Sequence, residues 1–241
     1  MMKAFYYDLH IHTCLSPCGD DDMTPANIVG MSALKGLDVI AITDHNTCKN
    51  CAAAMAHGKE YGVTVIPGME LTTQEEVHVV CLFPSLEQAM AFDSYVEKHI
   101  LPIPNRPETF GKQQIMNESD EIVAEYPTLL ISATDISFDD VFTLLQPYQG
   151  VMIPAHIDKN SFSLLANLGF VPPDSRFTAF ELKDFKNMHR IVRENPTLSG
   201  CKAISNSDAH YLEFISEPVN SLYAFSSNIK DILAALEQTK D

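Results

Sequence analysis

The sequence predicts a single α/β domain built on a parallel sheet, in the manner of an α/β barrel. The chain has 241 residues, which is a usual length for one such barrel. Short β-rich runs alternate with helical segments, a pattern typical of parallel strands joined by helical crossovers. Six of the nine histidines fall at or just beyond the carboxyl ends of predicted strands, the edge on which such barrels assemble their sites.

The first part of the chain is predicted to alternate regularly between strands and helices. Strands are expected at residues 4–9, 39–43, 63–67 and 78–83. The first helix begins after Thr24 as N-cap, with Pro25 at its first position, and Gly36 ends it. Further helices are expected at residues 49–61 and 85–99.

Residues 101–134 interrupt this alternation. Their second half predicts a short hairpin that turns near residues 117–120. We interpret the segment as an insertion within one domain that covers residues 1–241. After it, strands are expected at residues 150–154, 177–182, 202–205 and 221–225. The remaining helices are expected at residues 137–146, 161–168, 185–194 and 228–238.

The composition is strongly acidic. Sixteen Lys and Arg residues stand against 32 Asp and Glu, for a net charge of −16. Such a field repels polyanions, so the composition argues against non-specific binding of nucleic acid. The first residues lack the apolar run of a signal peptide, and no stretch is long enough to span a bilayer. We therefore expect a cytoplasmic protein without a membrane partner.

Acidic and imidazole side chains recur where strands are predicted to end. Asp8, His10 and His12 alternate along the chain and so share one side of the first strand. Two imidazoles and a carboxylate are costly to bury together unless something satisfies them, and a divalent cation does so directly. Asp208 and His210 repeat this spacing near the C-terminus. Such units on several strands point to a metal site.

The motifs DLHIHT, ITDHN, GMEL, the His after EEV, IPAHID and SNSDAH occur in this order between Asp8 and His210. In kind and order they resemble the motif series of the PHP family, named for polymerase and histidinol phosphatase domains. The resemblance implies a distorted (β/α)7 barrel that binds two or three divalent metal ions and hydrolyses phosphoesters. Mixed imidazole and carboxylate ligands suit Zn, Mn or Fe better than Mg or Ca.

The resemblance also implies how the motif residues share the ions. The first ion would be bound by His10, His12 and Asp208. Glu70 would bridge it to a second ion, which would also take His78 and His156. A third would be held by His45, His210 and a ligand from the loop after the first motif. Counting back from the Thr-Pro pair that begins the first helix favours Asp20 as that ligand, with Cys18 as the alternative.

Two further acids and a few basic residues complete the candidates. We expect Asp8 and Asp44 each to accept the free N–H of a ligand imidazole and so fix its tautomer. Asp44 could instead take part in proton transfer, which makes it the candidate catalytic residue. For substrate binding the sequence assigns no residue. Arg106, Lys112 and Lys159 are candidates for phosphate contacts, and solvated surface charge is the simpler explanation of each.

The six cysteines lie in a chain without a predicted export signal and are expected to be thiols. Cys48 and Cys51 open a helix, while Cys14 and Cys18 lie in the loop after the first motif. A four-thiolate zinc site or a redox pair is conceivable there. We favour unremarkable thiols, because the spacing of the first pair is not the usual one for zinc.

The sequence thus predicts a metal-dependent phosphoesterase that acts on a small phosphorylated metabolite or nucleotide. A nuclease of the same family is one alternative, against which the acidic composition argues. A binding module that keeps its metal without turnover is another, and hydrolysis of a C–N bond is a third. The exact substrate, the metal and the oligomeric state are left open by the sequence.

Overall fold

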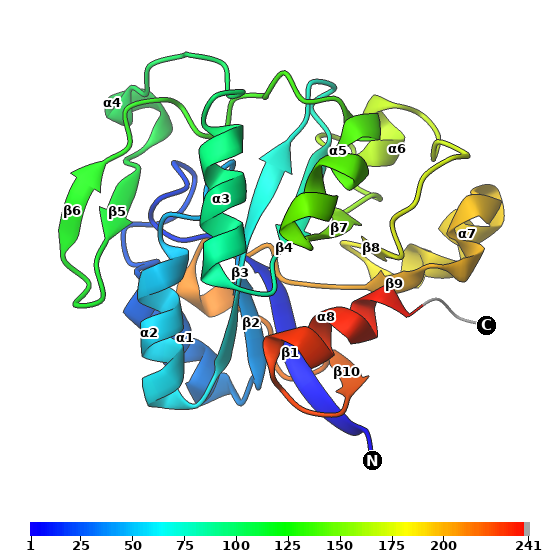
Figure 1. Ribbon diagram of the computed structural model, residues 1–241, viewed down its shortest axis with the longest axis horizontal. Coiled ribbons are helices and arrows are strands. Elements are labelled where there is room, and N and C mark those ends of the chain that lie inside the picture. Colours follow the sequence, from blue (N-terminus) through cyan, green and yellow to red (C-terminus); the bar gives the residue numbers. More distant parts are fainter. Residues whose placement is uncertain (239–241) are drawn as a thin grey trace.

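The computed structural model describes residues 1–238, arranged around a curled six-stranded sheet in the order β10-β1-β2-β3-β4-β7 (Figure 1). Its strands are β1 (Lys3–Ile11), β2 (Val39–Ile42), β3 (Thr64–Thr72), β4 (His78–Leu82), β7 (Val151–Pro154) and β10 (Ser221–Ala224). Two more strands, β8 (Ala179–Glu181) and β9 (Lys202–Ile204), pair in parallel beyond β7. Each predicted strand is present. The last three residues of the predicted domain lie outside the described residues.

The sheet is not parallel throughout, which corrects the sequence prediction. β1, β2 and β3 are parallel, but β4 runs antiparallel to both β3 and β7, and β10 runs antiparallel to β1. The connection from β3 to β4 is a tight turn in which the Thr73 N–H donates to the Val77 carbonyl (3.0 Å). Because β3 extends to Thr72 and not only to residue 67, too few residues remain for a crossover helix.

Helices cover the outside of the sheet. They are α1 (Pro25–Lys35), α2 (Cys51–Tyr61), α3 (Leu86–Val96), α5 (Phe138–Leu145), α6 (Leu164–Asn167), α7 (Met188–Glu194) and α8 (Ile229–Glu237). Four 3₁₀ helices lie at Gln146–Tyr148, Phe185–Asn187, Pro196–Gly200 and Leu212–Phe214. α1 has its predicted bounds, whereas α6 is a single turn and not the predicted helix over residues 161–168. Within residues 1–238, no helix is both long enough and apolar enough to cross a membrane.

The segment 101–134 contains α4 (Pro107–Phe110) and the antiparallel strands β5 (Gln114–Met116) and β6 (Ile122–Glu125). The hairpin turns where the sequence predicted it. Figure 1 shows it at the edge of the molecule above α2. The Asn50 side chain fixes β5, donating to the Gln114 carbonyl (3.1 Å) and accepting from the Met116 N–H (2.9 Å). The hairpin is thereby attached to the loop that follows β2.

The two ends of the curled sheet differ in polarity. At the amino ends of the strands, α8 packs its Ile232 and Leu236 into an apolar cluster with Leu9 and other strand residues. The Thr178 hydroxyl, just before β8, donates to the carbonyl of Leu236 in the same helix (3.2 Å). This packing closes the amino end with apolar side chains. The opposite end of the sheet carries the predicted metal ligands, and because β4 is antiparallel, His78 lies at the amino end of its strand and not at a carboxyl end.

Candidate metal centre

The carboxylate of Glu70, in β3, is the centre of the predicted ligand cluster. The residue is 1% exposed. Its two oxygens lie 2.8–3.3 Å from ring nitrogens of His10, His12, His45, His78 and His156. Burial alone would raise the pKa of Glu70, but the charges of His78 and His10 hold it well below its ordinary value. The carboxylate is therefore ionised and available to bridge cations.

His10 and His12 point the same way from β1, as their alternation predicted. Their Nε2 atoms are 3.2 Å apart, and the Asp208 Oδ1 atom lies 3.5 and 3.4 Å from them. Each Nδ1 atom faces away from this group, toward Glu181 Oε2 (3.0 Å) for His10 and Ser16 Oγ (3.0 Å) for His12. With Nδ1 donating, both Nε2 lone pairs converge beside two carboxylates. That donor set fits a divalent cation.

His10 and His12 have raised pKa values and so tend to hold protons. Burial lowers the pKa of His12, yet hydrogen bonds to Asp208 and Glu70 raise it to about 9. Burial likewise opposes a charge on His10, but Glu181 and Glu70 raise its pKa well above the ordinary value. Metal binding must therefore displace protons from these rings.

A second group consists of His12, His45 and His210, whose ligand atoms lie within 4.8 Å of one another. The buried His45 Nδ1 atom lies 3.1 Å from Glu70 Oε2, but the contact lacks hydrogen-bond geometry and the atom has no hydrogen-bond partner. This is unusual for a buried polar atom and fits a ligand position. Burial and the charge of His12 lower the pKa of His45 well below its ordinary value and that of His210 to about 4. Both rings are thus neutral at pH 7 and can offer lone pairs. His45 also forms a third group with Glu70 and His78.

Neither loop residue predicted for the third ion joins these groups among the described residues. The Asp20 N–H donates to the His210 carbonyl (2.9 Å), and its carboxylate accepts from the Asp22 N–H (2.9 Å). For Cys18, desolvation and the charge of Glu70 raise the thiol pKa to about 12. A ligand from this loop stays a prediction.

Asp44 reaches the imidazoles through another side chain and not directly. Its carboxylate accepts from the Thr13 N–H (2.7 Å), the Thr13 hydroxyl (2.8 Å) and the Ser16 hydroxyl (2.7 Å). Because the Ser16 oxygen also faces His12 Nδ1, Asp44 orients His12 through Ser16.

Asp8 also differs from its predicted contact. It accepts from the backbone N–H groups of Ser207 (3.0 Å) and Ser216 (2.9 Å). It therefore fixes the loops on either side of His210 instead of binding an imidazole.

Glu181 takes the part expected of Asp8, and the sequence reasoning missed it. Its carboxylate faces His10 Nδ1 and accepts from the His156 N–H (3.1 Å) and the Asn206 side-chain amide (2.7 Å). Burial would raise the pKa of Glu181, but the charge of His10 holds it below the ordinary value. The available signal was an acid inside the otherwise apolar predicted strand 177–182.

Of the basic candidates, Lys159 contacts the cluster, with Nζ 2.5 Å from Asp208 Oδ2. Lys112 instead pairs with Asp21 at the surface (2.6 Å), and the guanidinium of Arg106 lies over the Phe110 ring.

Cys48, Cys51 and Cys81 are core thiols. All three are at most 1% exposed. Burial raises the pKa of Cys48 well above its ordinary value and also raises that of Cys81. Among the described residues, no group close enough to hold an ion includes a cysteine. Thiolate chemistry is therefore disfavoured at these positions.

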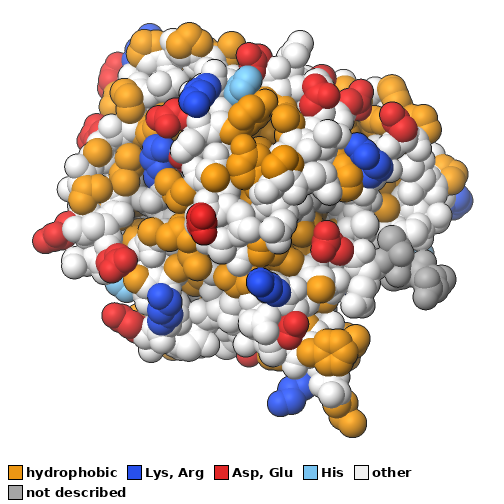
Figure 2. Space-filling model, in the orientation of Figure 1, with side chains coloured by type: hydrophobic (Ala, Val, Ile, Leu, Met, Phe, Trp, Pro, Cys, Tyr) orange, Lys and Arg blue, Asp and Glu red, His pale blue; other side chains and the backbone are white. Residues whose placement is uncertain are grey.

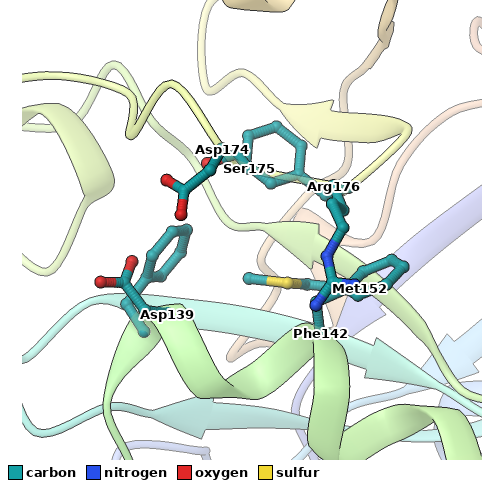
Figure 3. A pocket seen from close by; sticks show the side chains of 8 residues that line it. Asp139, Phe142, Met152, Asp174, Ser175 and Arg176 are labelled. Atoms are coloured by element: carbon teal, nitrogen blue, oxygen red, sulfur yellow. The ribbon is translucent and has the colours of Figure 1, made fainter.

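A cavity of about 250 Å³ lies apart from the metal ligands, between α5 and the segment before β8. Figure 3 shows Asp139, Asp174 and Arg176 around it. The Arg176 guanidinium lies 4.5 Å from the centre of the Phe142 ring and donates to the Thr143 hydroxyl (2.6 Å). Its positive charge is thus engaged within the protein.

The curled α/β sheet carries an imidazole–carboxylate cluster whose donor atoms fit divalent metal ions. The chain belongs to the PHP domain family, whose model matches residues 8–162. The family resemblance drawn from the motifs is thereby confirmed.

Two curated relatives match part of the chain. The uncharacterized protein MJ1587 of Methanocaldococcus jannaschii is 36% identical over 106 residues, which are 40% of this chain and 60% of that protein. A 5′-3′ exoribonuclease of Haemophilus influenzae is 34% identical over 79 residues, 32% of this chain and 28% of the enzyme. The matches thus span less than two thirds of either relative.

Solved structures share the fold. The lesion-specific endonuclease EndoQ of Pyrococcus furiosus has a TM-score of 0.68 at 18% identity, covering 98% of this chain and 58% of the enzyme. A putative metal-dependent phosphoesterase of Bifidobacterium adolescentis has a TM-score of 0.61 at 19% identity, covering 98% of both chains.

These similarities show that the argument against nucleic acid was wrong. The relatives include an exoribonuclease, and an endonuclease Q of similar fold has been solved with a 27-mer DNA duplex. The net charge of −16 is an average over the whole molecule. Figure 2 shows acidic and basic side chains dispersed over one face. Bound divalent ions would dominate the local field at the site whatever that average is.

Proposed function

We propose that the protein is a metal-dependent phosphoesterase that cleaves phosphodiester bonds in nucleic acid or short oligonucleotides. The observation that carries the proposal is the single carboxylate, Glu70, in contact with five imidazoles at one end of the sheet. Similarity to an exoribonuclease supports the choice of substrate class.

In this proposal the ligands divide as the family motifs imply. His10, His12 and Asp208 would hold one ion, with Glu70 bridging to a second at His78 and His156. His45 and His210 would contribute to a third, with Asp20 as the further ligand. Bound Zn, Mn or Fe would activate water and neutralise charge on the phosphoryl oxygens.

The protein's own groups would fix the ligands. Glu181 keeps the Nδ1 proton of His10, so that Nε2 is free to bind an ion. Ser16 does the same for His12, and Asp44 orients the Ser16 hydroxyl. We propose this orienting role for Asp44 ahead of direct proton transfer, since its carboxylate is fully buried behind Thr13 and Ser16.

We also propose that the curled sheet closes as a distorted (β/α)7 barrel of β1, β2, β3, β4, β7, β8 and β9. Two backbone hydrogen bonds support this closure. The Ile157 N–H donates to the Glu181 carbonyl (2.9 Å) after β7, and the His12 N–H donates to the Ala209 carbonyl (3.0 Å) after β9.

The test combines metal analysis with a substrate panel of a phosphomonoester, a mononucleotide and a single-stranded oligonucleotide. We expect two or three bound ions, and turnover of the oligonucleotide that falls as salt rises. Phe225→Ala, a change of an exposed residue next to the Ala224–Lys3 pair, is the control for general damage. Bound metal without hydrolysis of the oligonucleotide would contradict the proposal. Turnover of the phosphomonoesters alone would favour a small phosphorylated substrate, and no turnover at all would favour a binding module.

A further inference from the structure

We propose that Phe162 and Lys159, both in the loop between β7 and α6, bind the base and the phosphate of a nucleotide beside the cleaved bond. The inference rests on the proposed function and adds the groups that recognise the substrate. Phe162 lies outside the sequence motifs that carry the metal ligands.

Phe162 lies directly against a predicted metal ligand. Its ring is stacked on that of His78, with centroids 5.0 Å apart and an angle of 24° between the planes. The residue is 44% exposed. One face of the ring therefore covers the His78 imidazole, and part of the side chain is open to solvent. A planar base can stack on such an exposed aromatic surface.

The backbone at Phe162 is held in an unfavourable conformation. Its φ is 52°, in the left-handed region that bulky residues rarely adopt. Isolated exposed aromatic residues are common and need no explanation. An exposed aromatic residue that combines backbone strain with a contact to a ligand imidazole suggests a function, because such strain clusters at binding sites.

The surrounding loop is fixed at several points. The Phe162 carbonyl accepts from the His78 N–H (3.1 Å), and the Ser163 hydroxyl donates to the Lys159 carbonyl (2.7 Å). The Asp158 carboxylate accepts from the backbone N–H groups of Lys183 (2.6 Å) and Asp184 (2.9 Å). The ring is therefore positioned before a ligand arrives, which lowers the ordering cost of binding.

Lys159 provides the second contact. Its Nζ atom lies 2.5 Å from Asp208 Oδ2, while Asp208 Oδ1 faces His10 and His12. Its side chain is 33% exposed, so we infer that a phosphate oxygen can approach the ammonium group from the solvent side. An aromatic surface and an ammonium group on one loop match a base joined to a phosphate. A phosphorylated sugar would use the ammonium group alone.

The experiment compares two ligands that share a phosphate and differ in the base. Calorimetry measures the binding of AMP and of ribose 5-phosphate to the metal-loaded protein. We expect wild type to bind AMP roughly tenfold more tightly, which is the size of one base–aromatic stack. Phe162→Asn removes the ring while keeping a residue that tolerates a positive φ. In this variant AMP and ribose 5-phosphate should bind about equally, and the affinity for ribose 5-phosphate should be unchanged.

Three further variants complete the design. Phe162→Trp should retain the preference for AMP. Lys159→Gln should weaken the binding of both ligands by the same factor. Phe225→Ala removes another exposed ring, at 65% exposure, and should change neither affinity. Metal content is measured for each variant, because a ring that only holds His78 in place would lose metal when it is removed.

Three results would overturn the inference: an unchanged AMP preference in Phe162→Asn, no preference in wild type, or loss of metal on removing the ring. Hydrolysis is assayed separately. An active enzyme without base preference rejects only the inference. An inactive protein whose preference depends on Phe162 rejects only the proposed function.

Discussion

The predicted ligands fall into two regions that position their side chains differently. His10 and Glu70 lie within regular strands, where the sheet register fixes the direction of each side chain. His156 and Asp208 lie in loops and have positive φ values of 30° and 54°. Such conformations are costly for residues other than glycine, so the surrounding hydrogen bonds must hold them in place.

The ligands of the loop region depend on two buried acids that accept hydrogen bonds from backbone N–H groups. Glu181 accepts from the His156 N–H, and Asp8 accepts from the Ser207 N–H beside Asp208. The strand region places its ligands with less outside help. Changes to supporting residues should therefore harm the loop region most, whereas changes to a shared ligand should harm both.

The largest effect is expected from Glu70→Gln, which changes the ligand common to both regions. An amide cannot supply the negative charge that now faces five imidazoles. We expect loss of bound metal and a fall in kcat/KM of about 10³-fold or more. Metal analysis and steady-state kinetics measure both effects. A variant with full metal content and near-normal rates would contradict the central role of this carboxylate.

Asp8→Ala should destabilise the protein by about 2–4 kcal/mol. It leaves the Ser207 and Ser216 N–H groups without their acceptor in a buried site, and each such loss costs about 1–3 kcal/mol. Urea unfolding with a chelator present measures the change without metal binding. Asp38→Ala is the matched control, since Asp38 accepts the Tyr6 N–H (2.7 Å) near the exposed start of β1. Equal losses of stability in the two variants would show that Asp8 supports the loops no more than Asp38 supports the start of β1.

Glu181→Gln should lower metal affinity or kcat/KM by about 10–100-fold, the usual cost of altering a residue that orients a metal ligand. Because Glu181 supports His10 in the strand region and His156 in the loop region, its loss should exceed that of Asp44→Asn, which acts on His12 through Ser16. Metal titration of both variants makes the comparison. A larger loss for Asp44→Asn would reverse the ranking and point to a direct role in proton transfer.

The sequence predicted the strand region better than the loop region, for physical reasons. The alternation of Asp8, His10 and His12 has the period of a strand, so their shared direction could be read without coordinates. The contacts of Glu181 and Asp8 join residues that are far apart in the sequence. Glu181 and His10 are separated by 171 residues, and Asp8 and Ser207 by 199. No local pattern records such contacts. The antiparallel direction of β4 was missed because the extent of β3 is set by pairing with its neighbours and not by its own residues.

The smallest effect concerns pH and separates the two regions in the metal-free protein. The pKa of His12, after β1, is raised to about 9. Its contribution to the free energy of unfolding is therefore complete below pH 6.5 and is lost as pH rises toward 9. The pKa of His210, in the loop region, is lowered to about 4. Its contribution to the free energy of unfolding is therefore complete above pH 6.5 and is lost as pH falls toward 4. Between pH 6.5 and 8, His12 should account for a loss of at most about 2 kcal/mol. Urea unfolding of wild type, His12→Asn and His210→Asn with a chelator at pH 5, 6.5 and 8 tests this. The His12 change should flatten the alkaline side and also weaken the acid side, because the charge of His12 helps to lower the pKa of His210. The His210 change should flatten only the acid side. A His210 change that flattened the alkaline side instead would contradict this assignment.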